Sequence, residues 1–124
     1  MKVLITGASS GIGKDMAKYL SSMGHDLILV ARRKDLMDKL KEELTTSVEV
    51  IECDLSKEKN VYKLYESVKD KNIDVLINNA GFGLFGDFSK TDLDTELKMI
   101  DVNIKAPHIL TKLFLKDFIK KDNG

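Results

Sequence analysis

The chain has few of the residues that mark several protein classes. Its one cysteine, Cys53, cannot form an internal disulfide, so we expect a reducing, cytoplasmic location. Twenty basic and twenty acidic residues cancel, which favours neither nucleic acid nor an anionic membrane as partner. No apolar run approaches the roughly 20 residues of a membrane span, and Val3–Ile5 is shorter than a signal-peptide core of about 7–15 residues.

What the chain does have is enough apolar sequence, 43% of 124 residues, for the core of one domain spanning residues 1–124. Four aliphatic runs alternate with segments of helical periodicity and predict strands at Lys2–Thr6, Asp26–Ala31, Val48–Cys53 and Asp74–Asn78. Continuous apolar runs are typical of parallel strands that are covered on both faces. The sequence therefore predicts an α/β fold, a Rossmann-type doubly wound parallel sheet of order 3-2-1-4. Its ligand crevice is expected between the ends of strands 1 and 4.

Each intervening segment carries an apolar stripe with the period of a helix. The stripes are Ile12, Met16, Tyr19, Leu20 and Met23; Leu36, Leu40 and Leu44; and Val61, Leu64, Tyr65 and Val68.

The last predicted helix begins near Asp92 and carries two stripes, so it needs partners on two sides. We expect one face to cover the sheet and favour a subunit contact for the other, with a further helix as the alternative. One stripe runs through Leu93, Leu97, Ile100, Ile104, Thr111, Leu115 and Phe118, and the other through Met99, Val102, Ala106, Ile109 or Leu110, and Leu113.

A glycine-rich turn lies between the first predicted strand and the first predicted helix. Glycines allow positive φ there, and bare backbone lets a pyrophosphate approach the unpaired N–H groups of the helix's first turn. The helix dipole adds partial positive charge at the same place. An ordinary turn is the alternative, but the strand before it and the helix after it favour nucleotide binding. The residues concerned are Gly7, Ser9, Ser10, Gly11, Ile12 and Gly13.

The end of the second predicted strand indicates which dinucleotide binds. An NAD site usually has Asp or Glu there to hold the ribose 2′-hydroxyl, but this strand ends in Ala31 and is followed by Arg32 and Arg33. Either guanidinium could contact a 2′-phosphate with two parallel hydrogen bonds. Both arginines could instead be solvated at a helix start. The missing carboxylate favours NADP as the cofactor.

Three segments together resemble the short-chain dehydrogenases/reductases, over the whole chain: Thr6–Gly13, Asp54-Leu55 and Asn78–Gly81. The resemblance implies that Asp54 binds the adenine amino group and that Leu55 adds backbone contacts. It also implies that Asn78, Asn79, Ala80 and Gly81 support the sheet and line the ribose side of the crevice. A helix cap formed by Asp54 is compatible with that role.

The resemblance also assigns a catalytic part to Asn103, in Asp101-Val102-Asn103-Ile104. Pro107, four residues later, has no N–H to donate to the Asn103 carbonyl, so that carbonyl is freed. In the family such an asparagine lies at a helix kink, and its carbonyl holds a water of the proton relay. A kink that only bends the helix around the core is the alternative.

The family's catalytic serine and Tyr-x-x-x-Lys pair follow a fifth strand, and no such segment follows Asp92–Lys121. We therefore expect this chain to correspond to the N-terminal half of an NADP(H)-dependent oxidoreductase acting on a carbonyl or alcohol, and to be inactive alone. The alternative is a stand-alone NADP-binding or interaction module. Tyr65 and Lys69 have the spacing of that pair but lie between the third and fourth predicted strands, so we interpret Tyr65 as a core residue and Lys69 as a surface residue. Cys53 is interpreted as a core residue too, and His25 and His108 are too isolated for a metal site.

Without a fifth strand, the strand at 74–78 lies at a sheet edge with unpaired backbone groups. We therefore expect a homo-oligomer that forms through the helix at 92–121, the strand at 74–78, or both.

Overall fold

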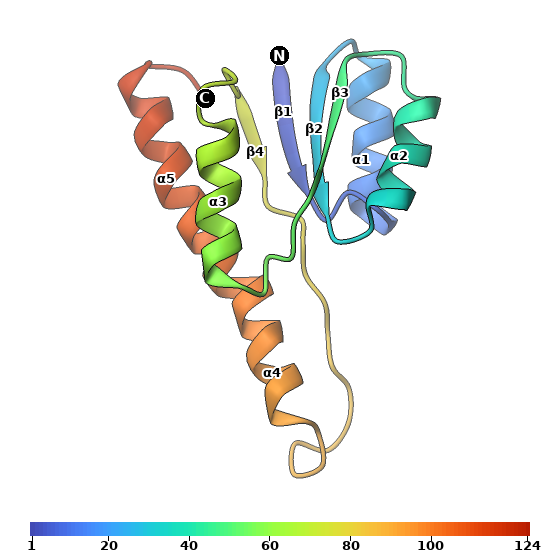
Figure 1. Ribbon diagram of the computed structural model, residues 1–124, viewed down its shortest axis with the longest axis vertical. Coiled ribbons are helices and arrows are strands. Elements are labelled where there is room, and N and C mark those ends of the chain that lie inside the picture. Colours follow the sequence, from blue (N-terminus) through green and yellow to red (C-terminus); the bar gives the residue numbers. More distant parts are fainter.

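In the computed structural model, which describes residues 1–124, four parallel strands form one sheet between two layers of helices (Figure 1). The order β3-β2-β1-β4 is the predicted one. The strands are β1 (Lys2–Thr6), β2 (Asp26–Ala31), β3 (Val48–Glu52) and β4 (Val75–Ile77). The first two have the predicted bounds. The other two are shorter than predicted, and β4 is followed by a turn in which Asn79 N–H donates to the Ile77 carbonyl.

Five α-helices accompany the sheet: α1 (Gly11–Ser22), α2 (Lys34–Glu43), α3 (Glu58–Val68), α4 (Leu93–Ile100) and α5 (Ala106–Lys120). Successive residues of a strand point to opposite faces, so each face has its own core. Val3 and Ile5 pack with α1 and α2, whereas Leu4 packs with α3 and α5. No helix is both long enough and apolar enough to cross a membrane.

The face of α1 that packs against the sheet differs from the predicted stripe. Its buried residues are Gly13, Ala17 and Ser21, with Met16 and Leu20 packed beside them. Small side chains let the helix approach the strands closely, and a pattern of large apolar residues does not reveal such a face. The predicted stripe residues Ile12, Tyr19 and Met23 are exposed.

On α2 the buried residues are Met37 and Leu40, so the predicted stripe is displaced by about one position at its start, where Leu36 is only half-buried. The predicted α3 stripe is confirmed, because its three aliphatic residues are buried and Tyr65 packs against the same core.

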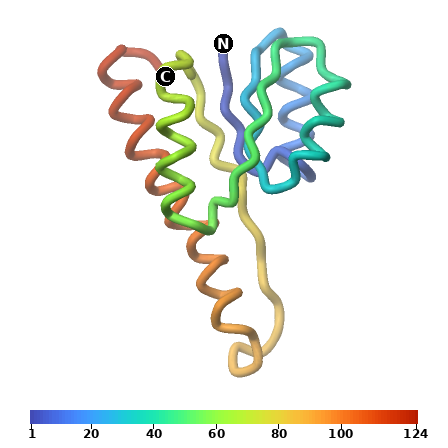
Figure 2. The backbone as a smooth tube through the Cα atoms, viewed as in Figure 1, coloured from blue at the N-terminus to red at the C-terminus, as the bar shows by residue number.

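The predicted last helix is divided into α4, a π-helical turn η1 (Asp101–Lys105) and α5. The stripe that covers the sheet is confirmed at Ala106 and Leu110, which are buried in the core shared with α3. At the C-terminal end of α5 the prediction is wrong, because Phe114, which neither stripe contains, is buried there and Phe118 of the other stripe packs against the same core. Figure 2 shows that α4 and the segment before it extend beyond the C-terminal ends of the strands. The large apolar residues that remain exposed on α4, η1 and α5 are Leu93, Leu97, Ile100, Ile104, Leu115 and Ile119.

Candidate functional site

A cavity of about 350 Å³ opens at the C-terminal ends of the strands, where the chain turns from β1 to α1 on one side and leaves β4 on the other. This is the crevice that the strand order predicts. Segments distant in sequence meet there because parallel strands end at one edge of the sheet. The predicted residues that line it are Gly7, Ser9, Ser10, Gly11, Ile12, Arg32, Arg33, Asp54, Leu55, Asn79, Ala80 and Gly81.

Two residues predicted at the crevice do not line the cavity. Asn78 instead donates from Nδ2 to the Thr111 hydroxyl of α5 at 3.0 Å, and Gly13 lies behind the lining residues Gly7 and Asn79. A Cβ at Gly13 would be 2.3 Å from the Gly7 carbonyl oxygen and 2.4 Å from Asn79 Nδ2. The glycine therefore permits the first turn of α1 to lie directly against the turn that precedes it and against the segment after β4.

The N-terminus of α1 offers N–H donors to the cavity. Gly7 and Gly11 have φ of +67° and +55°, which reverse the chain sharply between strand and helix. Ser10 does not cap the helix with its side chain, and the N–H groups of Gly11, Ile12 and Gly13 have no acceptor within the chain. Unpaired N–H groups at the positive end of a helix dipole form a site for an anion such as phosphate.

Thr6 joins the glycine turn to the segment after β4. Its buried hydroxyl oxygen accepts hydrogen bonds from the N–H groups of Asn79 (3.1 Å) and Ala80 (3.0 Å), and the hydroxyl donates to the Ile77 carbonyl (3.4 Å). Asn79 Nδ2 in turn donates to the Gly7 carbonyl at 3.1 Å. These bonds hold the two walls of the cavity together and account for the polar residues at the ends of β1 and β4.

Two arginines line the cavity at the end of β2, but their surroundings differ. Arg33 donates from Nε and Nη2 to the two carboxylate oxygens of Asp35, at 3.1 and 2.9 Å. That hydrogen-bonded carboxylate raises the pKa of Arg33. Arg32 makes no ion pair, so its guanidinium is the one free to meet an anion.

Asp54 faces the cavity at the end of the β3 segment. Its Oδ1 accepts hydrogen bonds from the Ser56 N–H (3.0 Å) and the Ser56 hydroxyl (2.7 Å). These bonds stabilise a turn before α3 and do not cap that helix, which begins at Glu58 after Lys57, so the helix-cap interpretation of Asp54 is wrong. Burial acts to raise the pKa of Asp54, but those two bonds, with the charges of Arg32 and Lys57, leave it lowered. Asp54 is therefore a carboxylate at neutral pH, and its Oδ2 is free to accept a further hydrogen bond.

Asn103 lies outside this cavity, in the π-turn η1. Its side-chain amide forms two bonds with the backbone of Phe82: Oδ1 accepts from the N–H at 2.9 Å and Nδ2 donates to the carbonyl at 2.7 Å. The Asn103 side chain thus fixes the segment after β4 to the helix.

The π-turn extends the predicted effect of Pro107 to a second carbonyl. The Ala106 N–H donates to the Asp101 carbonyl, not to that of Val102, and the next residue, Pro107, has no N–H. The Val102 carbonyl therefore loses both its i+4 and its i+5 donors, whereas Asn103 loses its i+4 donor as predicted. Val102, unlike Asn103, lines the cavity.

Tyr65 and Lys69 are engaged within the fold. The Tyr65 hydroxyl donates to Asp117 Oδ2 at 2.6 Å, and Lys69 pairs with Glu66 at 2.7 Å. The bond to Asp117, together with burial, raises the pKa of Tyr65 to about 12. A tyrosine acting as a general acid or base near neutral pH needs a lower pKa. The interpretation of Tyr65 as a core residue is confirmed, because it also packs edge-on against Phe114 with ring centroids 5.4 Å apart.

Four lining residues escaped the sequence analysis: Ala31, Cys53, Phe82 and Val102. Ala31, Cys53 and Phe82 adjoin predicted site residues, so extending each predicted segment by one residue would have found them. Val102 follows from the π-turn, which no local pattern signals. Burial, with the charge of Asp54, raises the pKa of the Cys53 thiol to about 11, so Cys53 lines the wall as an unreactive thiol.

A family model described as short chain dehydrogenase matches residues 1–124. An uncharacterized oxidoreductase of Staphylococcus epidermidis is 32% identical over 123 residues, which are 98% of this chain and 54% of that protein.

Two solved structures of similar proteins have the same fold, and this chain covers about half of each of them. The short-chain dehydrogenase from Sphingobium yanoikuyae in complex with NADPH superposes with a TM-score of 0.92 at 34% identity, over 99% of this chain and 50% of that one. The bulky-bulky ketone specific alcohol dehydrogenase from Comamonas testosteroni superposes with a TM-score of 0.92 at 34% identity, over 99% of this chain and 51% of that one. The chain thus spans about half the length of the proteins it resembles.

Proposed function

The chain belongs to the short chain dehydrogenase family, and we propose that its cavity binds the adenosine and pyrophosphate part of NADP(H). The observation that carries the proposal is the arrangement of donors around the cavity. Unpaired N–H groups of α1 lie at one side, and the unpaired guanidinium of Arg32 lies at the end of β2. A dinucleotide with a third phosphate on its ribose matches two separated anion sites.

The residues of the cavity fit this cofactor group by group. The N–H groups of Gly11 and Ile12 would hold the pyrophosphate, because both are unpaired at the N-terminus of α1 and both residues line the cavity. The free Oδ2 of Asp54 would accept a hydrogen bond from the adenine amino group. Arg32 would bind the 2′-phosphate, which NAD lacks. Similar proteins with solved structures in complex with NADPH and NADP support NADP(H) as the cofactor.

For a protein of the relatives' full length, we propose oxidation or reduction of an alcohol or carbonyl substrate, with the nicotinamide supplying or accepting a hydride. In these 124 residues the single Tyr-x-x-x-Lys sequence is Tyr65 to Lys69, and both side chains are engaged elsewhere. The proposal for the 124 residues themselves is therefore nucleotide binding without hydride transfer. A reducing, cytoplasmic location stays a prediction, based on the single cysteine.

Titration of the ¹⁵N-labelled chain with NADP⁺ tests the binding proposal at the level of residues. We expect the largest amide shifts at Gly11, Ile12 and Arg32, because these groups meet phosphates, and small shifts in α3 and α5 on the far face of the sheet. Shifts confined to α4 or α5, or none at millimolar NADP⁺, would reject the proposed cavity. Large shifts at Gly11, Ile12 and Arg32 would support the binding proposal, and hydride transfer by a full-length protein would then be the part that still needs a test.

We also propose that two copies of the chain associate through α4, η1 and α5. The occupant of the exposed apolar stripe on these helices is a second, antiparallel copy, because charges along the stripe are complementary. The α4 end carries Asp94 and Glu96 against one cation, Lys98. The α5 end carries Lys112, Lys116 and Lys120 against one acid, Asp117, which accepts a hydrogen bond from Tyr65. A two-fold axis would place each acidic end beside the basic end of the partner. The edge strand β4, which pairs only with β1, is the second candidate contact.

Light scattering tests this association. We expect a mass of twice 13.9 kDa for the unmodified chain and a monomer for Ile104→Glu, which puts a charge in the middle of the stripe. Tyr19→Glu, at an equally exposed aromatic residue on α1, is the control and should stay dimeric. A monomeric mass for the unmodified chain at high concentration would contradict the proposal.

A further inference from the structure

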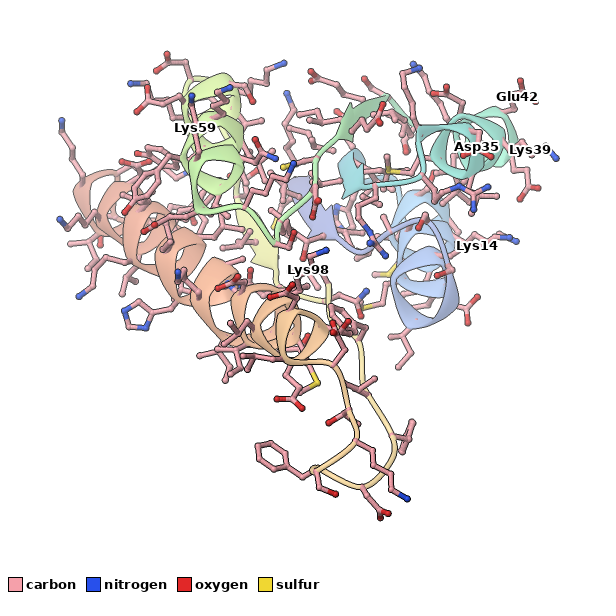
Figure 3. The ribbon with its side chains drawn as sticks, turned by 60° about the horizontal axis from the view of Figure 1, so that its bottom comes forward. Lys14, Asp35, Lys39, Glu42, Lys59 and Lys98 are labelled. Atoms are coloured by element: carbon pink, nitrogen blue, oxygen red, sulfur yellow. The ribbon has the colours of Figure 1, made fainter.

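Three consecutive cationic residues follow β2, and only two of them have an acidic partner. Arg33 pairs with Asp35 and Lys34 pairs with Asp38, at 2.9 and 2.7 Å, whereas Arg32 has no acidic partner. Asp35 and Asp38 lie on the first two turns of α2, so this helix supplies one carboxylate for each of two cations. Figure 3 looks at this edge of the molecule and labels Asp35 near the start of α2.

The Arg33–Asp35 pair affects the cavity because Arg33 lines it and Asp35 does not. Asp35 uses the Nε and Nη2 donors of Arg33, which form one of the two edges that a guanidinium can present to a phosphate. The carboxylate also cancels the charge of Arg33. The cavity therefore offers an anion at the end of β2 one guanidinium without an ion-pair partner, that of Arg32, whose charge also acts on Asp54.

We propose that Asp35 is a positioning residue that limits the preference for a 2′-phosphate by holding Arg33 in an ion pair. This inference rests on the proposed NADP site and adds a determinant of its selectivity. When Asp35 loses its charge, the charge of Arg33 is no longer compensated and at least one of its two bound donors is released, so the cavity then has two arginines for the 2′-phosphate. The pyrophosphate site at α1 is unaffected, so only ligands with a 2′-phosphate respond.

Calorimetric titration of the 124-residue chain with 2′,5′-ADP and with 5′-AMP isolates this effect, because the two probes differ only in the 2′-phosphate. We expect Asp35→Asn to increase the ratio of the two affinities by about three- to fivefold at low salt, the range for an exposed charge pair, with 5′-AMP binding unchanged. Asp35→Glu keeps a carboxylate within reach of Arg33 and should keep the unmodified ratio.

Two further variants test whether the effect comes from the Arg33–Asp35 ion pair or from any loss of negative charge on α2. Asp38→Asn removes the same charge one turn further along α2 but leaves the Arg33–Asp35 pair intact, and should change the ratio less than about 1.5-fold. In an Arg33→Ala background, Asp35→Asn should lose its effect, because the gain acts through the guanidinium.

The outcomes also distinguish this inference from the function on which it rests. If the unmodified chain binds both probes and Asp35→Asn alters the ratio no more than Asp38→Asn, the inference is wrong and the nucleotide site stands. A gain from Asp35→Asn that persists without Arg33 also overturns it. If the unmodified chain binds neither probe, the proposed function and the inference are both rejected.

Discussion

Replacing Gly13 with alanine is expected to lower the free energy of unfolding by at least about 3 kcal/mol, at the upper end of the cost of overpacking a core. The new Cβ would lie 2.3 Å from the Gly7 carbonyl oxygen, and that oxygen belongs to backbone which cannot rotate away as a side chain does. The Asn79 amide, at 2.4 Å, would have to leave its bond to the same carbonyl. Urea denaturation followed by circular dichroism measures the change.

Gly24→Ala is the matched control for Gly13→Ala. Gly24 has φ of +87° but open space around its Cβ position, so alanine there meets backbone strain without a clash. We expect a loss of about 1–2 kcal/mol, the cost of a left-handed residue with a side chain. If the two variants lose the same free energy of unfolding, the close approach of α1 to the glycine turn is not what Gly13 provides. In any folded fraction, Gly13→Ala should also weaken nucleotide binding, because relief of the clash moves the α1 N–H groups.

Replacing Arg32 with alanine is the second change with a large expected effect. Arg32 lines the cavity without an acidic partner, so it is the side chain whose charge is available to a 2′-phosphate. We expect affinity for NADP⁺ to fall by about tenfold or more, as for the loss of a hydrogen bond to a charged group, while affinity for NAD⁺ changes less than about twofold. Isothermal titration calorimetry measures both affinities on the same protein.

Comparing Arg33→Ala with Arg32→Ala shows which of the two arginines contributes more to NADP⁺ affinity. Its guanidinium is already paired with Asp35, so its loss should weaken NADP⁺ binding less than about threefold. A larger loss for Arg33→Ala than for Arg32→Ala would show that the ion pair opens when the cofactor binds, and would reverse the assignment. An equal loss of NAD⁺ affinity in Arg32→Ala would place Arg32 away from the 2′-phosphate.

The sheet could be predicted from sequence because its signals are local and strong. The aliphatic runs that form β1 and β2 carry the full pattern of a buried parallel strand within a few residues, and the glycine turn between β1 and α1 fixes where the chain reverses. The order of the strands then brought the predicted residues to one cavity. Twelve of the thirteen predicted cofactor-binding residues line it, and Gly13 lies beneath it.

What sequence reasoning missed depends on contacts between distant segments or on side-chain geometry. The face of α1 is set by how closely Gly13 and Ala17 approach the strands, which large apolar residues do not report. The π-turn coincides with the bonds between Asn103 and Phe82, 21 residues apart, and with Pro107. The pairing of Arg33 with Asp35 depends on side-chain conformations, so the sequence left two equivalent arginines where the structure distinguishes them.

The measurement that tests the central claim most directly is a parallel calorimetric titration of the unmodified 124-residue chain with NADP⁺ and NAD⁺ at low ionic strength. If the cavity holds the pyrophosphate at α1 and the 2′-phosphate at Arg32, both cofactors bind and NADP⁺ binds at least about tenfold more tightly. Equal affinities, or tighter binding of NAD⁺, would contradict the assignment of Arg32. No binding of either cofactor would contradict the claim that this cavity is a dinucleotide site.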